Sequence, residues 1–161
     1  MYQPNVRKFG PILKWLLGLA VVAIGIQSAV AAEIQTIQLT QTPCQFLESE
    51  GNINHGYKSE KKADCEAIND KMADQRLAEA ETLNLKAGSY IFRVTNKNVS
   101  YDLGFWLRGD GLINRARLPS VSGGGLFTGT TRDYKIDLEP GEYVYSCPLN
   151  TTPDYKLVVT E

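Results

Sequence analysis

The chain has 161 residues, enough for one domain and a targeting segment but too few for two ordinary domains. Its 17 basic and 18 acidic side chains give a net charge of −1, which excludes the strongly basic face of a nucleic-acid-binding protein. With one histidine and scattered acids, no Ser-His-Asp set, paired catalytic carboxylates or phosphate loop can be assembled, so the sequence does not favour an enzyme.

The first 32 residues have the order of a secretory signal peptide. Basic side chains at Arg7, Lys8 and Lys14 precede an apolar run over residues 15–26, and small residues follow over 28–32. This order predicts an exported protein that is cleaved near residue 32.

A permanent membrane anchor is the competing interpretation of residues 1–32. The apolar run is short for a bilayer span, which takes about 20 residues. Under either interpretation the remaining domain, 33–161, lies in the periplasm or outside the cell, and it touches the membrane only through an uncleaved N-terminal segment. Removal of residues 1–32 takes away three basic and no acidic side chains, which leaves a net charge of about −4.

After this segment, residues 34–39 alternate weakly and predict a first strand. Residues 44–57 are polar and without a period, so they predict a loop, and this loop contains the single histidine, His55. Residues 60–80 are strong helix formers, and Cys65, Ile68 and Met72 recur at spacings of three and four. This pattern predicts one surface helix with a thin apolar stripe.

The three cysteines form an odd set in an oxidising compartment. Cys44 and Cys65 bracket one polar segment and are the predicted disulfide, which would stabilise the fold by roughly 3 kcal/mol. Cys147 is then the free thiol. It is either buried as a small hydrophobe or used chemically, because an exposed thiol is a liability outside the cytoplasm.

The rest of the chain predicts short strands separated by turns. The strands are expected at 83–85, 90–95, 103–107, 134–138, 143–147 and 157–159, and loops at 108–111 and, because of its glycines, at 120–129. Within 103–109, Trp106 beside Arg108 is either a binding ridge or part of a core strand whose cation covers the indole. About seven strands favour a two-sheet antiparallel sandwich.

Two segments resemble the cupredoxin family. Leu83–Asn96 is similar to the family's strand, turn, strand and Asn, and Leu138–Pro148 resembles the hairpin "PGxYxYxC" that carries the copper-binding cysteine. The resemblance implies an all-β, Greek-key antiparallel β-sandwich over 33–161. Against this family pattern, 44–80 looks like a helical insertion.

A type 1 copper site needs two imidazoles, a thiolate and a weak axial ligand. The resemblance places the first histidine near Tyr101-Asp102, the second at 148–153 and the axial methionine near Asp154, and none of these residues is present. Only Cys147 carries over, so we expect no cofactor, with copper on non-standard ligands as the alternative.

One unusual ligand set is conceivable. A site formed by His55, Asp102 and Cys147 would bind zinc in preference to copper, or no metal at all. The alternative is that His55 is an ordinary solvated histidine of a loop.

The same end of the domain is the expected docking surface. In copper-binding relatives this end docks redox partners, so the resemblance implies a retained surface for a protein partner, possibly a membrane complex, and an accessory role. The candidate residues share the strand ends on that side: Tyr101, Asp102, Leu149, Asn150, Pro153, Asp154 and Tyr155. Tyr101 and Tyr155 would be the anchors. The alternative is that these residues only close the sandwich, with the tyrosines packed inward.

Overall fold

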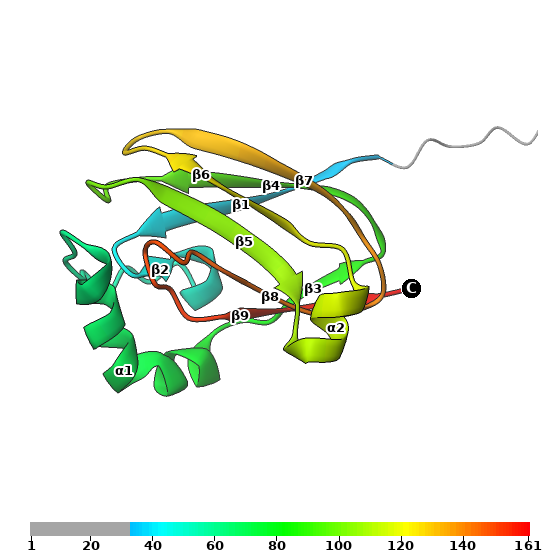
Figure 1. Ribbon diagram of the computed structural model, residues 1–161, viewed down its shortest axis with the longest axis horizontal. Coiled ribbons are helices and arrows are strands. Elements are labelled where there is room, and N and C mark those ends of the chain that lie inside the picture. The colour runs from blue at the N-terminus through cyan, green and yellow to red at the C-terminus, as the bar shows by residue number, and fades with distance from the viewer. Residues whose placement is uncertain (1–32) are drawn as a thin grey trace, which may run out of the picture. The chain divides into compact units, whose positions relative to one another are not determined.

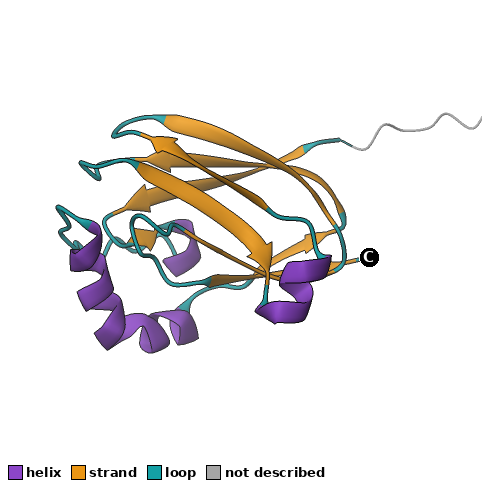
Figure 2. Ribbon diagram, viewed as in Figure 1, coloured by secondary structure: helices purple, strands orange, loops and turns teal. Residues whose placement is uncertain are grey.

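The computed structural model describes residues 33–161, so the predicted signal or anchor segment lies outside the described residues. Two β-sheets form a sandwich, with one long helix and one short helix at its margins (Figure 1, Figure 2). This confirms the predicted sandwich. Over residues 33–161, no helix is both long and apolar enough to cross a bilayer.

The first sheet has the order β2-β1-β4-β7. Its strands are β1 Gln35–Thr42, β2 Gln45–Phe46, β4 Gly88–Asn96 and β7 Thr131–Leu138. The second sheet has the order β3-β9-β8-β5-β6. Its strands are β3 Leu83–Lys86, β5 Leu103–Gly109, β6 Val121–Leu126, β8 Gly141–Ser146 and β9 Tyr155–Thr160.

Not every strand pair is antiparallel, which corrects the prediction in part. β1 pairs with β4 in parallel, and β3 pairs with β9 in parallel. Parallel neighbours need a long connection. The helix and β3 lie between β1 and β4, and the strands β4 to β8 lie between β3 and β9. The long segment after β1 therefore allows the crossover as well as carrying the helix.

Two predicted loops contain regular structure. The glycine-rich stretch forms β6, an edge strand, because its glycines let the backbone of β5 approach closely: a Cβ on Gly104 would lie 2.6 Å from the carbonyl oxygen of Gly123. The polar loop contains β2 and the short helix η1 Glu48–Glu50, and Phe46 of β2 is fully buried in the core. The sequence analysis also missed a helix, α2 Gly111–Arg117, which follows β5.

The long helix, α1 Lys62–Glu79, confirms the predicted surface helix. Only Cys65 and Arg76 of its residues are buried, and Met72 stands out into solvent. The helix is therefore attached to the sandwich by a covalent bond and a polar side chain instead of an apolar face.

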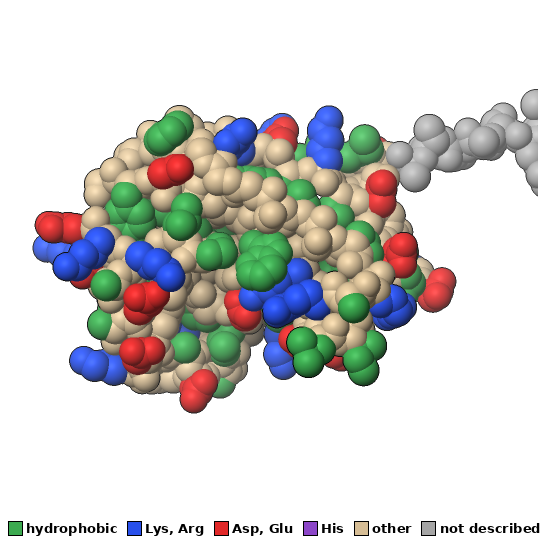
Figure 3. Space-filling model, in the orientation of Figure 1, with side chains coloured by type: hydrophobic (Ala, Val, Ile, Leu, Met, Phe, Trp, Pro, Cys, Tyr) green, Lys and Arg blue, Asp and Glu red, His purple; other side chains and the backbone are tan. Residues whose placement is uncertain are grey.

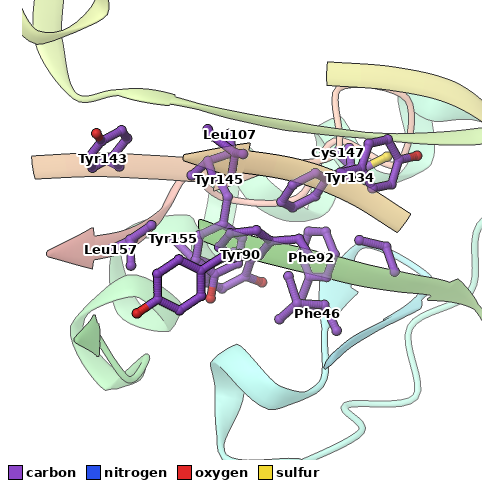
Figure 4. Packing of buried hydrophobic residues seen from close by; sticks show 14 of the residues in the cluster. Phe46, Tyr90, Phe92, Leu107, Tyr134, Tyr143, Tyr145, Cys147, Tyr155 and Leu157 are labelled. Carbon is purple, nitrogen blue, oxygen red and sulfur yellow. The ribbon is translucent and has the colours of Figure 1, made fainter. Parts of the chain in front are cut away.

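The core lies between the sheets and is rich in aromatic side chains (Figure 4). Tyr90, Phe92 and Val94 alternate along β4 and point inward. Phe46 makes edge-to-face contacts with the rings of Tyr145 and Tyr155, at centroid distances of 5.8 and 5.9 Å. Such pairs contribute about 0.5–1.5 kcal/mol each beyond their burial, which explains why the short strand β2 belongs to the core.

The two ends of the sandwich carry different features. At one end, here called the entry end, β1 begins at Gln35, β5 ends at Gly109 and β8 begins at Gly141. The C-terminus and α2 lie at this end (Figure 1). The opposite end, here called the cysteine end, holds the loop from β8 to β9 that begins with Cys147.

Candidate functional site

Cys147 follows the last residue of β8 and is completely buried within the aromatic cluster (Figure 4). Its Sγ accepts N–H bonds from the backbone of Gly104 at 3.4 Å and of Asn150 at 3.3 Å. Burial raises the pKa of the thiol, although these bonds oppose the shift. The side chain is thus a buried, protonated thiol, the first of the two interpretations that the sequence allowed.

Asn150 fills the stretch in which the family resemblance places a histidine ligand. Its side chain is buried, its Oδ1 accepts the backbone N–H of Cys44 at 2.9 Å, and its Nδ2 donates to the carbonyl oxygen of Thr42 at 2.8 Å. The amide therefore joins the cysteine loop to the turn after β1. Asn150 has no free surface for docking, which corrects that part of the prediction.

The predicted disulfide between Cys44 and Cys65 is present, with a Cα–Cα distance of 5.0 Å. Next to it, the Tyr101 hydroxyl bonds to the Ser59 hydroxyl and lies 3.4 Å from Oδ1 of Asn150. Burial raises the pKa of Tyr101. Tyr101 is half-buried and holds the insertion against the cysteine loop, so its hydroxyl is not available to a partner.

His55 belongs to a different group from Cys147. Its Nε2 lies 2.7 Å from Oε2 of Glu50, and its ring stacks on Tyr57 at 5.3 Å. Within residues 33–161, no three histidine, cysteine or acidic side chains lie close enough together to hold a metal, so His55, Asp102 and Cys147 do not form a ligand set. Since Cys147 is enclosed and Asn150 is committed to two backbone groups, the residues present do not fit a type 1 copper ion.

A buried polar network around Arg76 was not found from the sequence. The guanidinium donates to Oε1 of Glu50 at 2.6 Å and to the carbonyl oxygen of Cys44 at 2.8 Å, and it stacks on the Tyr57 ring at 5.0 Å. Burial disfavours the cation, but the bonds to Glu50 outweigh it, so the pKa of Arg76 is raised. Arginine in the last turn of a polar helix is usually exposed, and nothing in the spacing distinguishes Arg76.

Tyr155 closes the same network from β9. Its hydroxyl bonds to Oε1 of Glu50, and its ring is fully buried. Burial and the neighbouring Glu50 carboxylate raise its pKa. Tyr155 is therefore part of the core, and its prediction as a surface anchor was wrong. Pro153 is buried as well, whereas Asp102, Leu149 and Asp154 are exposed.

Trp106 lies on the outer face of the second sheet and is half-buried. The Arg108 guanidinium lies 4.0 Å from the indole centroid and that of Arg115 lies 5.5 Å away. Arg108 is itself buried, and it donates to Oδ2 of Asp154 at 2.6 Å and to the Ser146 hydroxyl at 3.1 Å. The cation does cover the indole, as one interpretation required, but outside the core.

An apolar hollow of about 360 Å³ opens beside Trp106, on the outer face at the cysteine end. We call it the apolar hollow; its lining residues come from β5, β6 and the cysteine loop: Gly104, Phe105, Trp106, Ser122, Gly123, Gly124, Pro148 and Leu149. Hydrophobic side chains gather over β5 in Figure 3. The signal in the sequence was the glycine run, which leaves this space without side chains.

The glycines of β6 face opposite sides of the sheet. A Cβ on Gly123 would lie 3.0 Å from the Tyr134 ring inside the sandwich, whereas one on Gly124 would meet only the carbonyl oxygen of Leu103 at 3.9 Å. Position 124 thus has room for a side chain on the side of the hollow.

No family model matches the chain, and no curated protein matches it either. Among solved structures it is similar to auracyanin B, with 15% identity, a TM-score of 0.49, and coverage of 79% of this chain and 89% of that one. It is also similar to reduced rusticyanin, with 22% identity, a TM-score of 0.36, and coverage of 48% and 61%. A multicopper oxidase from Campylobacter jejuni has 15% identity and a TM-score of 0.40, and the match covers 86% of this chain and 32% of that one.

We take no function from these likenesses. Independently of them, two observations agree with the fold that the sequence resemblance implied: the two packed sheets and the hairpin of β8 that ends at Cys147. The described chain is a cupredoxin-like β-sandwich whose hairpin cysteine is buried.

Proposed function

We propose that this protein is an exported, cupredoxin-like interaction protein, not an enzyme, and that it works without a type 1 copper ion. Its function is to dock a protein partner at the cysteine end. The apolar hollow between β5, β6 and the cysteine loop is the observation that carries the proposal. The disulfide supports export, because such bonds persist in oxidising compartments.

The lining of the hollow suits a protruding apolar side chain of a partner. Leu149 is 41% exposed at its rim, although large aliphatic side chains are usually buried. Hot spots of interfaces are pockets of this kind, in which one anchor is surrounded by apolar walls.

The walls are also held rigid before any partner binds. Trp106 lies under Arg108, and Arg108 is fixed by Asp154 and Ser146. A preformed pocket reduces the entropy that is lost on association. The exposed carboxylate of Asp102 favours a partner with a basic group beside its apolar anchor, which would speed and orient the encounter.

The test fills the hollow without disturbing the fold. A photo-crosslinking residue at Leu149 first identifies the partner in the native host, and the affinity of the purified pair is then measured. Gly124→Ile should weaken binding about tenfold or more at an unchanged melting temperature, because position 124 has space for a side chain.

Ile34→Ser is the matched control, since it removes an exposed aliphatic side chain at the entry end and should leave the affinity unchanged. Equal affinities of the Gly124→Ile variant and the original protein would refute docking in the hollow.

The alternative function is copper handling or electron transfer through Cys147 with non-standard ligands. It is favoured by the two backbone N–H bonds to Sγ, since hydrogen bonds to this sulfur tune blue-copper sites. Protein that is loaded with Cu(II) and dialysed separates the two functions. An intense visible band that disappears in Cys147→Ser supports the alternative, and a colourless sample supports the interaction protein.

A further inference from the structure

Helix α2 presents two large aliphatic side chains to solvent. Leu112 is 85% and Ile113 81% exposed, more than any other large hydrophobic side chain of residues 33–161. In Figure 3 hydrophobic side chains stand out over α2. Adjacent, fully exposed aliphatic residues on a helix are costly in water and mark contact sites.

The flanks of α2 are fixed, so these side chains are held outward. A Cβ on Gly109 would lie 2.2 Å from the carbonyl oxygen of Asn114, which shows that the helix packs directly on the backbone of β5. Leu118, just after the helix, is buried and donates its N–H to Asn114 at 2.8 Å. The helix is a rigid projection and not a loose loop.

The position of α2 in the fold indicates what it contacts. It lies at the entry end, where β1 begins at Gln35. Only residues 27–34 separate this strand from the apolar run at 15–26. Eight extended residues reach at most about 28 Å. In the uncleaved form, whose apolar run stays in the bilayer, this reach limits how far the entry end can lie from the membrane surface.

The charges of the helix fit an anionic surface. Its last turn carries Arg115 and Arg117, both exposed, and the helix contains no acidic residue. Asp110 and Glu142 are exposed beside it and balance these two positive charges, so the attraction to anionic lipid depends on the position of the arginines and not on net charge. A basic rim next to an apolar tip is the pattern of interfacial membrane contacts.

We propose that α2 is a membrane contact, in which Leu112 and Ile113 enter the interface of a bilayer and Arg115 and Arg117 meet the phosphates of anionic lipids. This contact is separate from the N-terminal segment and from the proposed docking at the apolar hollow. It orients the sandwich, because the cysteine end then points away from the membrane.

The test places a reporter on the helix. Full-length protein with Ile113→Cys is labelled with an environment-sensitive fluorophore; Cys147 is buried and does not compete for the label. Vesicles of phosphatidylcholine with about a third phosphatidylglycerol should shift its emission to the blue, and pure phosphatidylcholine should shift it less. The same label at Asp102→Cys, at the cysteine end, is the matched control and should not respond.

Two further variants test the parts of the contact. Leu112→Ser should reduce the blue shift several-fold, and so should Arg115→Gln combined with Arg117→Gln. Because the N-terminal segment is intact in every variant, a loss of the shift reports on α2 and not on tethering.

Three results would overturn the proposal. These are the absence of a shift at position 113, an equal shift at both labels, and a shift without vesicles that rises with protein concentration. The last result would assign α2 to contact with a second copy, which sedimentation would show as a dimer. Loss of partner binding in Gly124→Ile leaves this readout unchanged, so the two proposals fail separately.

Discussion

At the scale of single residues, Arg76 determines how the inserted helix is held. It is the one basic residue of α1 that is buried, and its partners come from η1, from the turn after β1 and from β9. Arg76 also donates to Oδ1 of Asn69 at 2.6 Å. Its partner Glu50 accepts the Tyr155 hydroxyl and lies 2.7 Å from Nε2 of His55. A buried charge with so many partners is expensive to disturb on one side only.

Arg76→Ala should lower the free energy of unfolding by about 3–5 kcal/mol, because Glu50 stays buried without its cation. Urea unfolding followed by circular dichroism measures the loss. The control is Arg93→Ala, which breaks an exposed ion pair with Asp133 and should change the stability far less, because solvent screens this pair. The double variant Glu50→Met and Arg76→Met should recover much of the stability, and equal losses in Arg76→Ala and Arg93→Ala would disprove the role of the network.

Single residues were the hardest part to predict from the sequence. The pairing of Cys44 with Cys65 followed from spacing and compartment, and it is present. The burial of Tyr155 and Asn150 did not follow, because their partners lie about a hundred residues away in the chain. Periodicity predicts which face of an element a side chain occupies. It does not predict which polar group from a distant part of the chain will be its hydrogen-bond partner.

At the scale of elements, β6 shows why a glycine run misleads. Glycine weakens an isolated strand, so the sequence predicted a loop. In the structure, Gly104 of β5 lets the backbone of β6 approach closely, and the pairing of Leu103–Leu107 with β6 keeps the glycine-rich segment extended. The low strand propensity of glycine is thus outweighed by the pairing of this segment with β5. Helix α2 was missed for a similar reason, because its seven residues show no apolar periodicity of their own.

The disulfide should act mainly on the inserted segment. Replacing Cys44 and Cys65 together by Ala should lower the free energy of unfolding by about 3 kcal/mol, as expected for a loop that closes over a separation of 21 residues. Hydrogen exchange should accelerate along α1 more than along β4, because the helix buries little else. Unchanged protection of α1 in the double variant would show that the Arg76 network holds the helix alone.

At the scale of the molecule, the two-sheet architecture was predictable and part of its topology was not. Apolar residues alternate along β4 and β7 in the sequence, and in the structure they form the inward faces, such as that of Tyr134 and Ile136. The parallel pairing of β1 with β4 and of β3 with β9 could not be predicted, because alternation is the same in both directions. The sequence motif around Cys147 located the cysteine end, but the apolar hollow beside it depends on three segments coming together.

The buried aromatic core makes the whole molecule sensitive to alkali. Burial raises the pKa of Tyr145 to about 12, and it raises the pKa of Tyr155 and of the Cys147 thiol as well. The unfolded chain releases the Tyr145 proton near its ordinary pKa of about 10. Stability from this group is therefore complete below pH 10 and is lost as the pH rises from about 10 to about 12, by up to roughly 3 kcal/mol.

Urea unfolding at a series of alkaline pH values measures this loss. Tyr145→Phe should flatten the slope between about pH 10 and 12, because the titrating hydroxyl is gone. Tyr57→Phe is the control, since the Tyr57 ring is only half-buried, and it should leave the slope unchanged. A free energy of unfolding that stays constant above pH 10 would contradict the assignment.

The two bonds of the Asn150 amide have a consequence for redesign. Asn150→His would place an imidazole in the stretch of the chain where the family resemblance places a histidine ligand. The same exchange removes the acceptor for the Cys44 N–H and the donor to Thr42, so it loosens the turn that carries the disulfide. Two buried backbone groups without partners cost about 1–3 kcal/mol each. A single substitution therefore cannot place an imidazole at this position without harming the attachment of the insertion to the cysteine end.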